Sequence, residues 1–263
     1  MDILWAALLG LIQGLTEFLP VSSSGHLVLA GHLIGLPSTG LIFELLLHLA
    51  TLVAVIYYYR TDVTGLVQAV PRSIVSPRSG YVHDPEVRLG ILVIIATLPT
   101  AVIGLFYKDH FERLAQQPQA VGVALLITAC LLLATHWIRP KEQQINAWMA
   151  IAIGIAQGLA ITPGISRSGA TIALALLLGI KTLEAARFSF LISIPAIGGA
   201  AVLKLKDGLG DINLGAAVIG FSVALISGYL ALRWLVALVQ KRRFAAFAPY
   251  CAVVGILAIA LAS

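Results

Sequence analysis

Charge is scarce in this sequence. Only 11% of its 263 residues are charged, against about 25% in an ordinary soluble domain. So little charge cannot cover a globular surface, which excludes a soluble enzyme, and the 59% hydrophobic content excludes a disordered chain. The mean hydropathy of +0.97 is instead typical of an integral membrane protein.

Cysteine and a basic segment are lacking too. The two cysteines, Cys130 and Cys251, lie within apolar runs, so we expect buried, unpaired side chains and not a disulfide or a metal pair. The 17 Lys and Arg residues do not gather on one segment, so nucleic acid is not an expected partner. A secretory signal is excluded because the start carries no basic residue and because Gln13 and Glu17 interrupt the first apolar stretch.

Six apolar stretches are long enough to cross a hydrocarbon layer of about 30 Å, which takes about 20 residues. Aromatic and basic residues mark several of their ends, as at 57–60 and 241–243. If the loop 60–88 is cytoplasmic, the cationic residues divide 11 to 4 between the two sides, which predicts that both termini lie outside. The expected spans are 41–59, 89–107, 120–137, 188–203, 214–236 and 247–261.

Two further apolar segments, 4–33 and 148–178, are each interrupted by a short polar break. The first break runs from Pro20 to Gly25 and the second from Pro163 to Gly169. Each arm is too short to span a membrane alone, so the pattern predicts two re-entrant helix–loop–helix segments.

These two segments match each other at a fixed offset of 144 residues, with seven identities in 16 positions. Each half then holds one re-entrant segment and three spans, and because three is odd the second half is inverted. We therefore predict an all-α polytopic membrane protein with six transmembrane helices and two re-entrant segments in an inverted repeat. It forms a single membrane domain, 1–263, with halves at about 1–140 and 145–263. Paired broken helices are typical of transporters, whose ligand site lies where the breaks meet. The identities pair Gly10, Gln13, Gly14, Leu15, Ser22, Ser24 and Gly25 with Gly154, Gln157, Gly158, Leu159, Ser166, Ser168 and Gly169.

The polar residues of the breaks predict an anion site. A helix begins after each break, and its free N–H groups and dipole attract an anion. Arg167 cannot lose its proton to escape the cost of burial, and its planar fork matches phosphate oxygens. Phosphate is therefore the expected anion. The expected substrate-binding residues are Ser22, Ser24, Ser166, Ser168 and Thr171.

A carboxylate in such a site implies a cation. Glu17 has the wrong sign for a phosphate unless a divalent cation lies between them, and Mg²⁺ typically uses one or two carboxylates plus substrate phosphates. Gln13 lies four residues earlier on the same helix face and would supply a neutral oxygen. The sequence thus predicts a metal site at Glu17 and Gln13, with Mg²⁺ or Ca²⁺ as the ion. Alternatively, Glu17 pairs with Arg167, and Gln13 joins two helices.

The same region offers a nucleophile. Ser23 lies within three residues of His26, which permits attack of the serine on phosphorus with Glu17 or His26 as the base. His26 itself or water could be the nucleophile instead, and the residues leave this choice open. The expected catalytic residues are Glu17, Ser23, His26 and Arg167.

The stretches QGLTEFLPVSSSGH at 13–26 and PGISRSGAT at 163–171 resemble the (E/Q)xxxE and PGxSRSxxT motifs of bacterial undecaprenyl-diphosphate phosphatases of the bacitracin-resistance type. The resemblance runs over essentially the whole chain. It implies hydrolysis of undecaprenyl diphosphate to the monophosphate carrier of peptidoglycan synthesis, with dependence on a divalent metal. It also implies a multi-pass protein of the bacterial plasma (inner) membrane, often a homodimer, whose site faces the periplasm or cell exterior. The family roles transfer to Glu17, Ser23, His26 and Arg167, while Gln13 leaves one ionised metal ligand fewer.

Three other functions compete with this one. A polyprenyl-phosphate transporter or flippase is favoured by the inverted repeat, although a fold does not fix a function. A structural scaffold would leave the buried Arg167 unexplained. Lipid phosphatases of the acid-phosphatase type share Ser24-Gly25-His26, but they need a histidine after Ser166-Arg167, and none follows position 136.

Overall fold

The computed structural model describes residues 2–34, 41–75, 77–138, 141–205 and 213–261. Nearly all of them are helical, and the one β-bridge within them is an isolated pair, Gln143 with Ile180. Five of the described helices are long and apolar enough to cross a membrane. These are α6 (Pro85–Phe106), α8 (Pro118–Ala134, extended by η1, Thr135–Trp137), α11 (Thr182–Leu205), α12 (Leu214–Gln240) and α13 (Ala248–Leu261, preceded by η2, Phe244–Phe247).

Counting a bent helix pair as one span brings the number of candidate spans to six. Helix α3 (Leu41–Tyr58) is followed directly by α4 (Arg60–Val75), and the pair passes the same length and hydropathy test with an angle of 84° between its parts. The protein is therefore an all-α, multi-pass membrane protein, which confirms the predicted fold class.

The two interrupted segments form pairs of short helices, as predicted. Helices α1 (Ile3–Phe18) and α2 (Ser23–Ile34) flank the first break, and α9 (Ala147–Leu159) and α10 (Arg167–Leu177) flank the second. Each break contains a residue with positive φ, Ser22 at 69° and Gly164 at 98°. At position 164 glycine relieves strain, and a side chain there would also strike the carbonyl oxygen of Val121 at 2.4 Å.

Three short helices lie in segments that hydropathy alone treated as loops: α4, α5 (Pro77–His83) and α7 (Lys108–Ala115). Helices α4 and α7 are amphipathic and interrupt their apolar residues with polar ones, so a search for apolar runs misses them. At the next helix start, Asp84 caps α6 by accepting hydrogen bonds from the backbone N–H groups of Val87 and Glu86. These bonds, and then the nearby Arg72, hold the pKa of Asp84 below its usual value.

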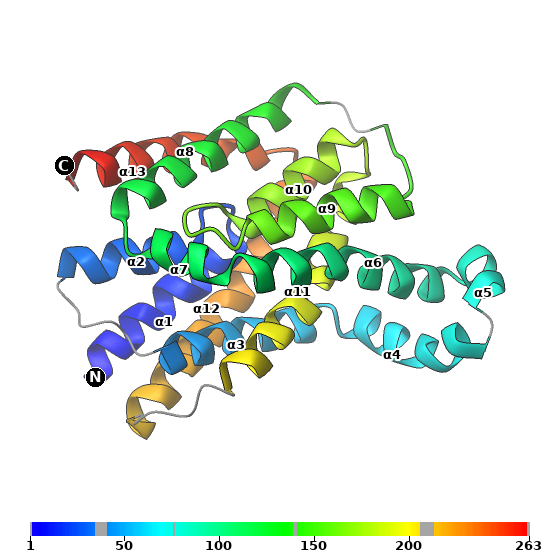
Figure 1. Ribbon diagram of the computed structural model, residues 1–263, viewed down its shortest axis with the longest axis horizontal. Helices are drawn as coiled ribbons and strands as arrows, with labels where there is room; N and C mark the ends of the chain where they lie inside the picture. Colours follow the sequence, from blue (N-terminus) through cyan, green and yellow to red (C-terminus); the bar gives the residue numbers. More distant parts are fainter. Residues whose placement is uncertain (1, 35–40, 76, 139–140, 206–212, 262–263) are drawn as a thin grey trace.

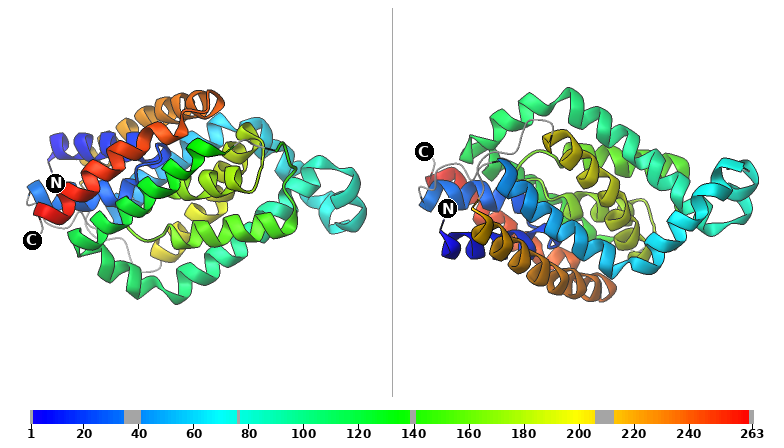
Figure 2. Two further views of the ribbon diagram at one scale, coloured as in Figure 1. Left: turned by 90° about the horizontal axis from the view of Figure 1, so that it is seen from above. Right: turned by 90° about the horizontal axis from the view of Figure 1, so that it is seen from below.

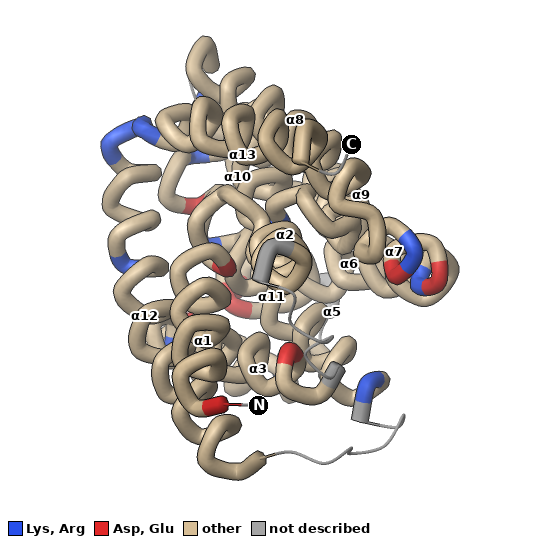
Figure 3. The backbone as a smooth tube through the Cα atoms, turned by 90° about the vertical axis from the view of Figure 1, so that its left-hand side faces the viewer, with Lys and Arg blue, Asp and Glu red and all other residues tan. Residues whose placement is uncertain are grey.

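The two termini lie at one end of the molecule and α5 lies at the other (Figures 1 and 2). Figure 3 shows that long stretches of the helices carry no charged residue, whereas α7 carries several. This distribution agrees with a bundle whose long sides face lipid.

The inverted repeat is visible in how helices pack. Helix α1 packs against α12, and its counterpart α9 packs against α6. At equivalent glycines a Cβ would strike the partner helix, so the small residues permit close approach in both halves. In the first pair of equivalent contacts, Gly10 faces Gly220 and Gly154 faces Ala96. In the second, Gly14 faces Ser227 and Gly158 faces Ile103.

Gly14→Ala is expected to destabilise the protein. The added Cβ would lie 2.0 Å from Ser227 Oγ and 2.7 Å from the carbonyl oxygen of Ala224, so α1 and α12 must separate. Overpacking of this kind costs about 1–3 kcal/mol. Thermal unfolding in detergent would report a lower Tm. Gly198→Ala is the matched control, because nothing lies within 4 Å of its added Cβ. Equal Tm values for the two variants would contradict the proposed helix contact.

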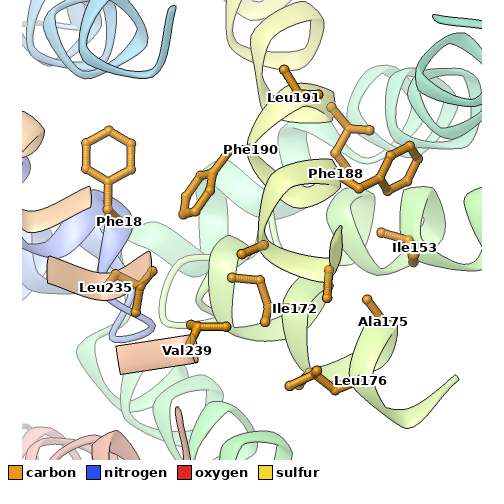
Figure 4. Close-up of a cluster of buried hydrophobic side chains, with 14 of the residues drawn as sticks. Phe18, Ile153, Ile172, Ala175, Leu176, Phe188, Phe190, Leu191, Leu235 and Val239 are labelled. Carbon is orange, nitrogen blue, oxygen red and sulfur yellow. The ribbon is translucent and has the colours of Figure 1, made fainter. Parts of the chain in front are cut away.

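The main core packs between the re-entrant helices and α11. Phe18, Phe190 and Ile172 are among its members (Figure 4), and the rings of Phe18 and Phe190 meet edge to face at 5.8 Å. Of the two cysteines, Cys251 is buried as expected, whereas Cys130 is exposed on α8, which corrects the prediction. An apolar run shows that a residue lies in a span but not which face of the helix it occupies. Both cysteines are free, as predicted.

Candidate active site

The two breaks lie against each other near the centre of the fold. A Cβ on Gly25 would lie 3.1 Å from Gly164 Cα, and a Cβ on Gly169 would lie 3.4 Å from Pro20 Cβ. Gly25 and Gly169 are equivalent in the repeat, as are Pro20 and Gly164, so the two contacts are related by the same pseudo-symmetry. The backbone N–H of Gly164 also donates to Ser22 Oγ at 3.1 Å. The breaks therefore meet, as the repeat predicts.

Repeat-equivalent serines cap the two helices that leave the breaks. Ser166 Oγ accepts from the backbone N–H of Gly169 at 3.1 Å, and Ser22 Oγ accepts from that of Gly25 at 3.3 Å. Such caps fix the helix starts. Ser24 Oγ lies 3.4 Å from Ser22 Oγ. Ser22 and Ser166, both expected to bind substrate, therefore already hold helix ends.

The other two expected substrate-binding residues hold the second break in place. Ser168 Oγ donates to the carbonyl oxygen of Leu19 at 3.4 Å, which joins the breaks a second time. Thr171 Oγ1 donates to the carbonyl oxygen of Arg167 and lies 2.5 Å from Ser189 Oγ on α11.

Four polar side chains converge on the buried carboxylate of Glu17, at the end of α1. Its Oε2 accepts from Ser23 Oγ at 2.5 Å and from Gln13 Nε2 at 3.0 Å, and Arg167 Nη2 forms an ion pair with Oε1. His48 Nε2 of α3 lies 3.8 Å from Oε2. Gln13, Glu17, Ser23 and Arg167 are thus brought together from α1, α2 and α10. Ser23 and Arg167 occupy equivalent positions in the two halves, yet both contact the same carboxylate.

Two polar atoms of this cluster are buried without a hydrogen-bond partner among the described residues. They are the oxygen Gln13 Oε1, an acceptor, and the nitrogen Arg167 Nη1, a donor. A buried polar atom without a partner costs about 1–3 kcal/mol, so each one calls for an explanation. The unpartnered oxygen of Gln13 suits a cation, and the unpartnered nitrogen of Arg167 suits an anion.

The equivalent glutamine of the second half, Gln157, differs in what its amide nitrogen contacts, although its Oε1 is likewise buried without a hydrogen-bond partner among the described residues. Gln157 Nε2 donates to Thr100 Oγ1 at 3.2 Å and to the carbonyl oxygen of Ile192 at 3.3 Å, so it joins α9 to α6 and α11. This side chain holds helices together and lies apart from the Glu17 cluster.

His26 faces another part of the fold. Its Nδ1 lies 2.8 Å from the carbonyl oxygen of Ser22, and its Nε2 lies 2.7 Å from the hydroxyl of Tyr250 on α13. The imidazole is therefore held by its own backbone and by the last helix, and both of these hydrogen-bond partners lie outside the Glu17 cluster.

Sequence reasoning missed Thr128 of α8. Its Oγ1 donates to the carbonyl oxygen of Gly164 at 3.0 Å and accepts from the backbone N–H of Ser166 at 3.0 Å. One buried hydroxyl thus satisfies two backbone groups of the second break. The available signal was a lone threonine in an apolar span. Tyr250 and Ser189 were missed as well; Tyr250 lies 224 residues along the chain from His26, and Ser189 lies 18 residues from Thr171.

A divalent cation fits this cluster. Gln13 Oε1 and the Glu17 carboxylate are hard oxygen donors, and Gln13 Oε1 has no other partner among the described residues. Among those residues no group of three or more His, Cys, Asp or Glu side chains could hold a metal by itself. The remaining ligands would be phosphate oxygens and water, which is a common arrangement for Mg²⁺.

Fold and site together define a multi-pass membrane protein with a polar centre, built on the Glu17–Arg167 ion pair, where two broken helices meet. The chain belongs to the family described as "Bacitracin resistance protein BacA", whose pattern matches residues 6–257.

Curated relatives cover nearly all of the chain, and all those named here are called undecaprenyl-diphosphatase. The protein of Methanobrevibacter smithii is 42% identical over 98% of this chain and 96% of its own length. Those of Rubrobacter xylanophilus and Desulfosudis oleivorans are 41% and 44% identical, over 99% and 97% of this chain and 98% and 97% of their own lengths. These names do not favour the transporter that the repeat suggested.

Proposed function

We propose that this chain is a membrane enzyme that hydrolyses undecaprenyl diphosphate to undecaprenyl phosphate and inorganic phosphate. The observation that carries the proposal is the cluster at Glu17, where one carboxylate holds a serine hydroxyl and an arginine whose second nitrogen has no partner among the described residues. The family and the names of its members support the same activity.

The geometry favours Ser23 as the nucleophile. Its hydroxyl already donates to Glu17, so the carboxylate can take the proton as Ser23 Oγ attacks the terminal phosphorus. The bond from that phosphorus to the bridging oxygen breaks, and undecaprenyl phosphate leaves. Water then hydrolyses the phosphoserine, inorganic phosphate leaves, and the proton on Glu17 returns to Ser23.

Arg167 binds the terminal phosphate and stabilises its charge in the transition state. Nη1 is available for an oxygen, and the ion pair to Glu17 sets the direction of the guanidinium. The first N–H groups of α2 and α10 contribute further positive potential. Gln13 and Glu17 would hold a Mg²⁺ or Ca²⁺, which when bound neutralises charge on the diphosphate.

The lipid partner, the location and the orientation of the protein are part of the same proposal. The lipid partner keeps its polyprenyl tail in the bilayer while the diphosphate enters the cluster. The protein lies in the plasma (inner) membrane of its cell, with the site facing the periplasm or exterior, as the distribution of cationic residues favours. We retain the homodimer and the half boundaries, about 1–140 and 145–263, as predictions.

Phosphate release from C15 and C55 prenyl diphosphates, with purified protein in detergent, tests the proposal. We expect release by the wild type, loss with chelator, and recovery when Mg²⁺ or Ca²⁺ is added. Ser23→Ala should lose activity by about 10²–10⁴-fold or more, and acid-quenched wild type should carry a phosphoserine that this variant lacks. Ser73→Ala, at a partly exposed serine of α4 outside the Glu17 cluster, is the matched control and should retain activity.

Absence of release from the wild type, with retained binding of the same lipid, would overturn the hydrolase assignment in favour of a carrier. Full activity of Ser23→Ala would refute only the serine nucleophile and would move the first step to water or His26.

A further inference from the structure

Tyr250 belongs to neither motif, yet it contacts His26, one of the catalytic residues expected from the sequence. It lies 224 residues from His26 along the chain, near the start of the last helix, and its hydroxyl is 2.7 Å from His26 Nε2. The two rings are parallel within 5°, with centroids 5.6 Å apart. The contact therefore fixes both the plane and the direction of the imidazole.

The partner of the other ring nitrogen determines the tautomer. His26 Nδ1 lies 2.8 Å from the carbonyl oxygen of Ser22, and a carbonyl oxygen can only accept a hydrogen bond. In the neutral ring Nδ1 therefore carries the proton and Nε2 carries the lone pair. The tyrosine hydroxyl must then donate to Nε2. When the ring is protonated, the same hydroxyl can accept from Nε2, so the contact persists in both states.

A second contact holds this end of α13 against the first break. The Cys251 thiol donates to the carbonyl oxygen of Pro20 at 3.4 Å, and Cys251 is buried. Two consecutive residues of α13 thus contact the first break, at Pro20, and the start of α2, at His26. The Cys251 contact therefore holds the backbone of Tyr250 near the first break.

We infer that Tyr250 is a positioning residue for the reaction: it holds His26 in the Nδ1–H tautomer with Nε2 directed away from the backbone. The inference rests on the proposed phosphatase function, since it assigns His26 a part in it. Position 170, the repeat equivalent of His26, is an alanine, so the second half has no such histidine to position.

The test is Tyr250→Phe, which removes one oxygen and keeps the ring. We expect kcat for prenyl diphosphate to fall about tenfold, the effect of losing one hydrogen bond of ordinary strength, with KM and Tm unchanged. In a His26→Gln background the same change should have no further effect, because the two residues act as a unit. Tyr229→Phe, a tyrosine of α12 in ring contact with Tyr57, is the matched control and should keep the wild-type kcat.

An unchanged kcat in Tyr250→Phe, or an equal loss with and without His26, would overturn the inference. ¹⁵N NMR of histidine-labelled protein, with His26→Gln to assign the signal, tests it without turnover. A protonated Nδ1 and an Nε2 signal that moves in Tyr250→Phe are expected; a protonated Nε2 in the neutral ring would refute the tautomer. If the wild type releases no phosphate, the proposed function fails and this spectrum alone decides the contact.

Discussion

Glu17→Gln is expected to lower kcat/KM for phosphate release by at least about a thousandfold. The amide keeps the shape of the side chain but removes its charge, so it can neither take the proton of Ser23 nor pair with Arg167. Loss of a general base alone typically costs 10²–10⁴-fold. Phosphate release under saturating divalent metal measures the effect.

Stability must be measured beside activity, because removing one partner of a buried ion pair typically costs about 3–5 kcal/mol. Glu17→Asp separates the two effects. It keeps the charge but withdraws the carboxylate by one methylene, so we expect it to fold and still lose most activity. Glu86→Gln, at an exposed carboxylate that pairs with Arg72, is the matched control. Full activity in a folded Glu17→Gln protein would exclude Glu17 as the general base.

Arg167→Lys is expected to lower kcat/KM by about 10²–10³-fold, the usual effect of removing one preorganised group that stabilises transition-state charge. Lysine keeps the positive charge but carries it on a single ammonium nitrogen. It can meet either Glu17 or a phosphate oxygen, whereas the guanidinium offers Nη2 to the carboxylate and Nη1 to the ligand. Inhibition by inorganic phosphate should weaken in parallel.

Arg187→Lys is the matched control for this variant. Arg187 is also an arginine held by carboxylates, since its Nε donates to Asp62 at 2.7 Å and its Nη1 to Glu184 at 3.3 Å. It lies outside the Glu17 cluster, so its replacement should alter Tm and leave kcat/KM near the wild-type value. Equal losses of kcat/KM in both variants would indicate that Arg167 supports the fold and does not bind the phosphate.

The membrane architecture could be predicted from the sequence because hydropathy and the internal repeat follow from simple physical constraints. A run of apolar residues must leave water, and a polar break in a short run must find partners inside the protein. The identities around Gln13 and Gln157 placed both breaks, and the structure has helices on each side of them. Helices α4 and α7 were missed because each has one polar and one apolar face, so neither contains a long run of apolar residues.

Side-chain partners were harder to predict, since they depend on rotation and close packing. Gln13 and Gln157 are equivalent in the repeat, yet one contacts Glu17 and the other joins three helices. Thr128 and Tyr250 lie in apolar helices, and only the folded arrangement brings them to the breaks. Local pattern identified the residues on the breaks but not those that other helices bring to them.

The equivalence of Ser23 and Arg167 limits how such a site can be assembled. A symmetric homodimer of either half alone would place identical residues at this position, giving two serines or two arginines at the junction. A serine hydroxyl and a guanidinium sharing one carboxylate require that the two halves differ. A cluster that joins this serine and this arginine therefore needs two unequal halves, and making positions 23 and 167 alike in either direction would remove it.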